Sequence, residues 1–142
     1  MKKNEKGFSL IEVVIALLLL GIIGVALLSG FATASMALVI ADERTTAESL
    51  ARSQMEYVKN QGYNTAPAGG EAIYEKITGI PGGYTIWSVN RADATVEDII
   101  GVPWDSQNNQ AVDTDAGLQR VKLVIKHHDK EIITLEGYKV DR

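Results

Sequence analysis

Residues 6–40 read KGFSLIEVVIALLLLGIIGVALLSGFATASMALVI. Between Lys6 and Asp42, Glu12 is the only charged side chain, and residues 13–28 form an unbroken apolar run. A helix needs about 20 predominantly apolar residues to cross the hydrocarbon core of a bilayer. With residues 29–40 added, the uncharged span exceeds that length, so we predict a membrane-spanning helix.

The charges that flank this apolar segment differ in sign. Three lysines lie within residues 1–7, whereas Asp42 and Glu43 follow the segment. Positively charged flanks stay on the cytoplasmic side of a membrane. We therefore expect a single-pass protein of the cytoplasmic (inner) membrane with a cytoplasmic N-terminus, and with residues 42–142 exported.

Glu12 lies at the head of the apolar segment, where an ionised side chain is costly. A charge at the centre of a bilayer costs about 2.5–3.5 kcal/mol on insertion scales, and less near the edge. An ionisable residue inside a membrane span is by default a candidate functional residue that needs a partner. Glu12 is therefore the first candidate site residue.

The residues that precede the apolar run have a specific order, KGFSLIE at positions 6–12. This order resembles the cleavage and methylation signature of type IV prepilins and type II secretion pseudopilins. The resemblance implies that a prepilin peptidase cleaves after Gly7 and N-methylates the new N-terminal residue, Phe8. It also implies that Glu12 pairs with the terminal amine of a neighbouring subunit during filament assembly.

Electrostatics supports such a pair. After cleavage, the amine of Phe8 would carry a positive charge into an environment of low dielectric constant, where a carboxylate from an adjacent helix would neutralise it. Removal of one member of a buried ion pair strands the other and typically costs about 3–5 kcal/mol. The pair would therefore set the axial register between subunits more than it adds net stability.

Small residues interrupt the apolar helix, and residues 8–60 contain no proline. Small side chains at i,i+4 spacing let helices approach closely in lipid, which suits packing in a filament core. Glycine is also generally frequent in membrane-spanning helices, so both explanations stay open. The candidate packing residues are Gly21, Gly24, Ala26, Gly30 and Ala34.

The helical pattern continues beyond the membrane span. Apolar residues recur at three- and four-residue spacing on one face, which predicts an amphipathic continuation over residues 41–60. Gly62 is expected to end this helix. The apolar face consists of Ala47, Leu50, Ala51, Met55 and Val58.

The rest of the chain has the patterns of a small antiparallel sheet. Alternating and β-branched residues predict a short strand near 73–77 and longer strands at 84–90, 118–126 and 131–140. The last two form a hairpin whose turn contains His128, Asp129 and Lys130. Residues 61–82 are otherwise predicted to be a connecting loop, and residues 93–117 to be irregular.

These elements predict an α+β fold. A long N-terminal helix, membrane-spanning in its first half and amphipathic in its second, packs on a small C-terminal antiparallel sheet. This layout is the pilin fold that the resemblance implies. The expected domains are a cleaved leader at 1–7, a transmembrane and filament-core helix at 8–40, its amphipathic continuation at 41–60, and an exported domain at 61–142.

The composition disfavours catalysis and nucleic-acid binding. The chain has no cysteine and no Gly-x-Ser-x-Gly, Walker or His-Glu-x-x-His pattern, so we expect neither an enzyme nor a cofactor. The formal net charge is −4, and residues 42–142 hold 11 basic against 16 acidic residues. A nucleic-acid-binding surface needs clustered positive charge, so no nucleic acid is expected as a partner.

Two groups of polar residues contain side chains of the kinds that bind metal ions. Asp105, Asp113 and Asp115 offer oxygen atoms of the kind that calcium prefers, but they match no EF-hand pattern, and a solvated acidic loop is the alternative. His127 and His128 are adjacent at a strand end, so their side chains are expected to point to opposite faces. We therefore expect no metal site, with the three aspartates as a calcium alternative.

The features together predict a structural subunit, a minor pilin or minor pseudopilin of a type IV pilus or type II secretion-type filament. Its expected partners are prepilin peptidase, other pilin or pseudopilin subunits through the N-terminal helix, the assembly platform and the lipid bilayer. In the filament it would reach the cell surface or the periplasm.

Two other functions stay open at this point. One is a secreted soluble binding module whose signal peptide is cleaved after Ala34, since residues 32–34 supply an Ala-x-Ala sequence. The other is a membrane-anchored protein with no filament role, which would keep Met1 or Lys2 as its N-terminus.

Overall fold

The computed structural model describes residues 9–142 and divides after Ala41 into two compact units. One helix, α1 (Leu10–Asn60), supplies the described part of the first unit and the start of the second. It is rich in Leu, Ala and Ile and contains no proline, so it continues through Gly21, Gly24 and Gly30 without a break. Between residues 10 and 41 nearly all of its side chains are exposed.

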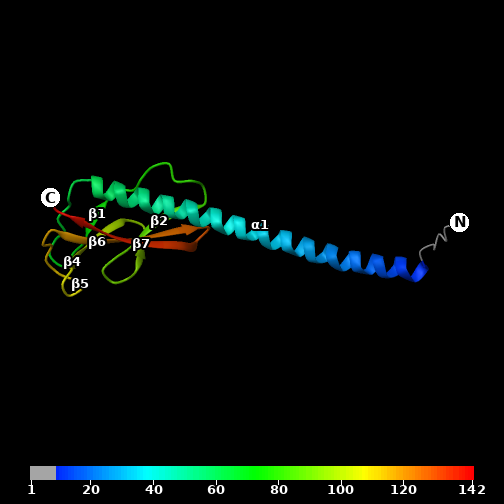
Figure 1. Ribbon diagram of the computed structural model, residues 1–142. Helices are drawn as coiled ribbons and strands as arrows, with labels where there is room; N and C mark the ends of the chain where they lie inside the picture. The colour runs from blue at the N-terminus through cyan, green and yellow to red at the C-terminus, as the bar shows by residue number, and fades with distance from the viewer. Residues whose placement is uncertain (1–8) are drawn as a thin grey trace, which may run out of the picture. The chain divides into compact units, whose positions relative to one another are not determined.

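Seven strands follow α1 within the described residues and form one antiparallel sheet (Figure 1). They are β1 (Ala72–Tyr74), β2 (Tyr84–Val89), β3 (Thr95–Val96), β4 (Ile99–Asp105), β5 (Gln110–Ala111), β6 (Leu118–His127) and β7 (Lys130–Val140). The fold is α+β, as predicted.

The centre of the sheet is β6, which pairs with three other strands. Along one edge it pairs with β4 near Arg120 and with β2 from Leu123 to His127, and along the other edge it pairs with β7. The buried hydroxyl of Ser88 joins β2 to β4, because it donates to the Asp98 carbonyl and accepts from the Ile100 N–H. The strand order is β1-β4-β6-β2-β3, with β5 beside β4.

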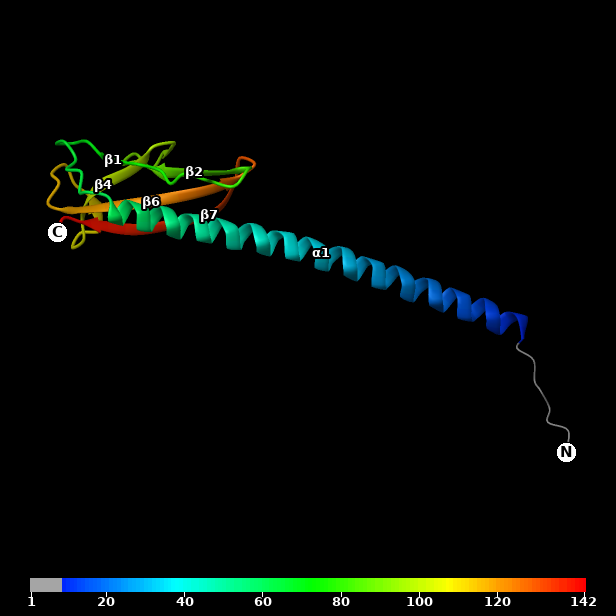
Figure 2. The ribbon, with the colours of Figure 1, turned by 90° about the horizontal axis from the view of Figure 1, so that it is seen from above.

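The core of the second unit lies between residues 42–60 of α1 and one face of the sheet (Figure 2). The apolar face predicted on this part of α1 is buried, with Ala47 and Val58 fully inaccessible. It packs with Val121, Leu123 and Ile125, which alternate along β6 and are also fully buried. Burial of both periodic faces accounts for the packing of helix on sheet.

The prediction that residues 93–117 are irregular is wrong. They contain β3, β4 and β5, and β4 is buried from Ile99 to Trp104. A strand that is buried on both faces has no apolar–polar alternation, and this removes the usual signal. Pro103 lies inside β4 opposite Gln119 of β6, and its carbonyl accepts a hydrogen bond from the Val112 N–H.

The prediction for the β6–β7 turn also needs a correction. The turn has two residues, His128 and Asp129, whose φ angles of 47° and 64° are those of a type I′ hairpin. Side-chain alternation stops where the strand ends, so the rings of His127 and His128 do not point to opposite faces. Their centroids lie 4.2 Å apart.

Candidate functional site

The predicted processing site straddles the start of the described chain. Gly7 and Phe8 lie outside the described residues, so the structure does not place the predicted cleavage and methylation site. The first described residue, Ser9, accepts hydrogen bonds through its carbonyl from the N–H groups of Glu12 and Val13, at 2.9 and 3.2 Å. Ser9 is therefore the N-cap residue of α1.

Glu12 is the third residue of α1, in the first helical turn. A Ser at the N-cap followed by a Glu three residues later is the capping-box sequence, and a carboxylate there also complements the helix dipole. The Glu12 side chain is exposed, and none of the ion pairs within residues 9–142 includes it. Its position thus suits two roles, stabilisation of its own helix start and pairing with a charge from another chain.

The candidate packing residues are all exposed or half-buried on α1. A Cβ atom added to Gly21, Gly24 or Gly30 would meet nothing within 4 Å. Ala26 and Ala34 are exposed as well. No contact inside the described chain accounts for these small residues, so their predicted role in helix–helix packing stays a prediction.

Two polar side chains of the apolar segment donate hydrogen bonds to the backbone of their own helix. Thr33 Oγ1 donates to the Ser29 carbonyl at 3.0 Å, and Ser35 Oγ donates to the Phe31 carbonyl at 2.9 Å. Such i−4 bonds let hydroxyl groups lie in hydrocarbon without water. By length and composition, α1 is able to cross a membrane.

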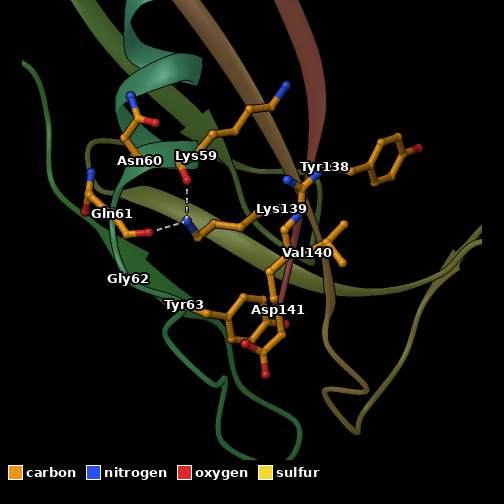
Figure 3. A pocket seen from close by; sticks show the side chains of 10 residues that line it. Lys59, Asn60, Gln61, Gly62, Tyr63, Tyr138, Lys139, Val140 and Asp141 are labelled. Carbon is orange, nitrogen blue, oxygen red and sulfur yellow. Dashed lines mark hydrogen bonds between the residues drawn. The ribbon is translucent and has the colours of Figure 1, made fainter.

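At the other end of α1, the ammonium group of Lys139 caps the helix (Figure 3). It donates to the carbonyls of Val58 at 2.7 Å, Lys59 at 3.1 Å and Gln61 at 2.6 Å. These are among the carbonyls that a helix C-terminus leaves without partners, and a cation there also complements the helix dipole. Lys139 is 5% exposed, and this burial lowers the pKa of its amine.

The helix ends close to Gly62, as predicted, but the glycine itself does not cap it. The last helical residue is Asn60, and Gly62 does not adopt the positive φ of a glycine cap. The Lys139 amine, supplied by β7, satisfies the last carbonyls instead. The 480 Å³ pocket beside this cap is lined by the end of α1 and the end of β7.

Two glutamines attach the loop after α1 to the helix. The buried Gln54 accepts from the Ile77 N–H and donates to the Glu75 carbonyl, both at 2.9 Å. Gln61 accepts from the Glu75 N–H at 2.9 Å and donates to the Glu75 carbonyl at 3.1 Å. The side-chain amides of Gln54 and Gln61 therefore bind the backbone just after β1, in the way that the backbone of a neighbouring strand would.

Asp115 holds the same loop against the start of β6. Its carboxylate accepts from the Tyr63 hydroxyl, the Gln119 amide and the N–H groups of Ala66 and Gly117. Burial alone would raise the pKa of Asp115, but the four donors outweigh that effect and lower it. Burial, together with the hydrogen bond to Asp115, raises the pKa of Tyr63.

Gln119, whose Nε2 donates to Asp115, extends this hydrogen-bond network into the core through its Oε1 atom. Gln119 is fully buried, accepts from the Tyr74 hydroxyl at 2.6 Å, and donates to the Asn64 carbonyl at 2.7 Å. β4 passes directly behind it at Gly101, where an added Cβ would lie 2.4 Å from Gln119 Oε1. Glycine is therefore needed at position 101, because the backbone of β4 lies too close to the Gln119 side chain for a Cβ atom to fit between them.

The sequence patterns did not identify Lys139, Gln54 or Gln119 as functional residues. Each nevertheless has a sequence signal, because each is a polar residue at an apolar position of a periodic pattern. Lys139 continues the inward-facing series of β7, and Gln54 lies within the apolar stripe of α1. A long polar side chain at such a position indicates a specific buried partner.

The three aspartates of the calcium alternative have separate functions. Asp105 accepts from the backbone of the β4–β5 turn, Asp113 pairs with Arg91, and Asp115 has the four donors described above. The described residues contain no group of three or more His, Cys, Asp or Glu side chains suited to hold a metal ion. The structure thus gives the calcium alternative no support.

Comparison with known proteins adds one match. Residues 2–28 match the prokaryotic N-terminal methylation motif. No curated protein and no solved structure matches the chain. The matched residues include the predicted cleavage point and the first turns of α1, and the motif points to a structural subunit. The chain therefore carries, at residues 2–28, the prepilin signal of type IV pilins and pseudopilins.

Proposed function

We propose that this protein is a minor pilin or minor pseudopilin, a structural subunit of a type IV pilus or a type II secretion-type filament. The proposal rests on one observation, the overlap of the methylation motif with the start of α1. The methylation motif at 2–28 overlaps a helix that begins directly after the predicted cleavage point and continues unbroken to Asn60. A simple membrane anchor needs neither the motif nor the amphipathic extension.

In this proposal, prepilin peptidase removes residues 1–7 by cleavage after Gly7 and methylates the amine of Phe8. Residues 8–40 then anchor the subunit in the cytoplasmic membrane and later form part of the filament core. Residues 41–60 continue the helix, and residues 61–142 form the exported head. The assembly platform and other subunits receive the chain through its N-terminal helix, on which Gly21, Gly24, Ala26, Gly30 and Ala34 form the close contacts.

Glu12 has the decisive role in assembly. Once Phe8 is the N-terminus, Ser9 at the N-cap and Glu12 in the first turn place a carboxylate close to the mature chain end. The terminal amine of one subunit and the Glu12 carboxylate of a neighbour would neutralise each other in a medium that solvates neither. Correct pairing is then possible only at one axial offset between helices.

The preference for a minor subunit is supported by the head. It is small, closes with the β6–β7 hairpin, and contains no cysteine for the disulfide that closes the C-terminal region of many major pilins. The end of β7 is held instead by the buried Lys139 cap, and the loop after α1 by the Asp115 network.

The test is the intact mass and N-terminal sequence of the mature protein from its native membrane. The proposal requires a chain that begins with N-methylated Phe8. A chain that begins at Ser35 would overturn it in favour of a secreted module, and a chain that retains Met1 or Lys2 would leave a membrane anchor without a filament role. As a control, Gly7→Val should block cleavage without changing the described residues.

A further inference from the structure

The two outer edges of the sheet, at β1 and at β7, differ in whether other parts of the chain hydrogen-bond to them. Near β1, side-chain amides hydrogen-bond to the backbone groups of this edge. Asn64 Nδ2 donates to the Ile73 carbonyl at 2.8 Å, and Gln54 and Gln61 bind the backbone of Glu75. An additional strand would have to displace these amides. This end of the sheet is therefore blocked.

The opposite edge is open. Within residues 9–142, β7 pairs with β6 alone, along its whole length, and its residues make no backbone hydrogen bond beyond that ladder. A bulge places the extra residue Ile132 between Glu131 and Ile133, and residues 133–140 are regular after it. Eight residues offer about 27 Å of free strand edge. β3 and β5 have only two residues each.

A free edge of this length is a template for another strand, and soluble proteins usually cover or shorten it. Here its side chains favour a particular partner. The face of β7 that points away from α1 carries Thr134, Glu136 and Tyr138, all exposed, and Glu131 lies just before the bulge. The charged residues that β7 itself presents on this face are acidic. β6 places Lys126 and Lys122 opposite them, but neither Glu131 nor Glu136 makes an ion pair within residues 9–142. A strand that pairs here is therefore favoured by Lys or Arg on the same face.

A second copy of this chain does not fit that requirement. Two β7 strands side by side would bring acidic faces together. α1 and β7 also run in the same direction, since Glu43 lies beside His127 at one end and Val58 beside Lys139 at the other. An antiparallel β7 pair would thus direct residues 42–60 of the two α1 helices in opposite directions, which disfavours anchorage of both chains in one membrane. Only this last step depends on the proposed function.

We propose that residues 133–140 of β7 receive an extended strand from a different chain, and that this strand presents basic side chains beside Glu131 and Glu136. Main-chain hydrogen bonds supply most of the affinity in this type of recognition, and side-chain pockets and charges supply specificity. The proposal gives the head a lateral interface that is separate from the N-terminal helix.

The probe is a labelled peptide with the sequence LQRVKLVIKH, which is that of β6, the natural neighbour of β7. Its control is LQEVELVIEH, with the three basic residues replaced by glutamate. Full-length protein in neutral detergent micelles should bind the basic peptide at least about tenfold more tightly than the control, and empty micelles should bind neither preferentially. The double variant Glu131→Lys, Glu136→Lys should reverse this preference.

Hydrogen exchange locates the bound peptide. The proposal requires slower exchange of amides within residues 133–140, with β1 and β3 unchanged. Absence of binding, equal binding of both peptides, or protection elsewhere would each overturn it. Because the chain has no cysteine, Thr134→Cys provides a single thiol on the open edge. Disulfide-linked homodimers of that variant in the native membrane would show that the occupant is a second copy instead. The N-terminal processing test does not depend on β7, so the two proposals fail separately.

Discussion

The Nζ atom of Lys139 lies 2.7 Å from the carbonyl oxygen of Val58, a residue 81 positions earlier in the chain. The last turn of α1 is thus completed by the last strand of the sheet. Because Lys139 also binds the carbonyls of Lys59 and Gln61, one side chain ends the helix, neutralises the negative end of its dipole and ties it to β7. The stability of the head therefore depends on the contact between the end of α1 and the end of β7.

Replacement of Lys139 by methionine should destabilise the head by about 1–3 kcal/mol, because buried carbonyls lose their donor. Urea unfolding of the full chain in detergent, followed by tryptophan fluorescence, is a direct measurement, since both tryptophans, Trp87 and Trp104, lie in the sheet. Lys139→Arg is the matched control and should recover part of the loss. Equal stability of Lys139→Met and wild type would contradict the capping role.

If Lys139 ends the helix, Gly62→Ala should change the free energy of unfolding by less than about 0.5 kcal/mol. Gly62 has no positive φ, and an added Cβ would meet nothing within 4 Å. The same fluorescence measurement applies. A loss similar to that of Lys139→Met would mean that glycine, and not the lysine, ends the helix.

Gly101→Ala should be strongly destabilising, by about 1–3 kcal/mol or more. The added Cβ would lie 2.4 Å from Gln119 Oε1 and 2.8 Å from Tyr74 Cε2, two groups that are held by their own hydrogen bond. Gly137→Ala is the control of equal size. Its Cβ would meet the flexible end of Met55, so we expect a smaller loss. The reverse order of the two unfolding midpoints would refute the argument from close approach.

Asp115→Asn should destabilise the head at neutral pH by about 1–3 kcal/mol, because the new amide group places a donor against the donors around it. The pKa of Asp115 is lowered on folding, so its contribution to stability is present above its unfolded value of about 3.8 and is lost as the pH falls through the folded value. The stability difference between wild type and variant should therefore shrink below about pH 4. Urea midpoints measured from pH 6 to below 3 test this, and a constant difference would exclude Asp115 as the titrating group.

Glu12→Gln separates the two roles of that residue. Glutamine also fits the capping-box pattern but carries no charge, so the start of α1 should stay intact. Incorporation into filaments should fall by about tenfold or more, because the partner amine is left without a counter-charge. Glu12→Ala should lose both. Cleavage after Gly7 should persist in both variants, as mass spectrometry would show, and normal filaments of Glu12→Gln would assign the residue to helix capping alone.

Local sequence patterns predicted a large part of this molecule. The apolar segment that precedes Asp42, the stripe from Ala47 to Val58 and the alternation in β6 each follow from the period of one element. The motif at 2–28 is also local, and so the prepilin signal was readable from its order of residues. These properties depend on neighbours within a few positions.

Only the tertiary structure shows what ends α1, where β4 lies and which edge of the sheet is open. β4 has no alternation because both its faces are buried, and Lys139 has no local feature that names Val58 as its partner. The contact of Tyr74 with Gln119 likewise joins residues 45 positions apart. The physical reason is the same in each case. Periodicity indicates which face of an element is buried, whereas the partner of a buried polar group depends on which distant segments the packed core brings within hydrogen-bond distance.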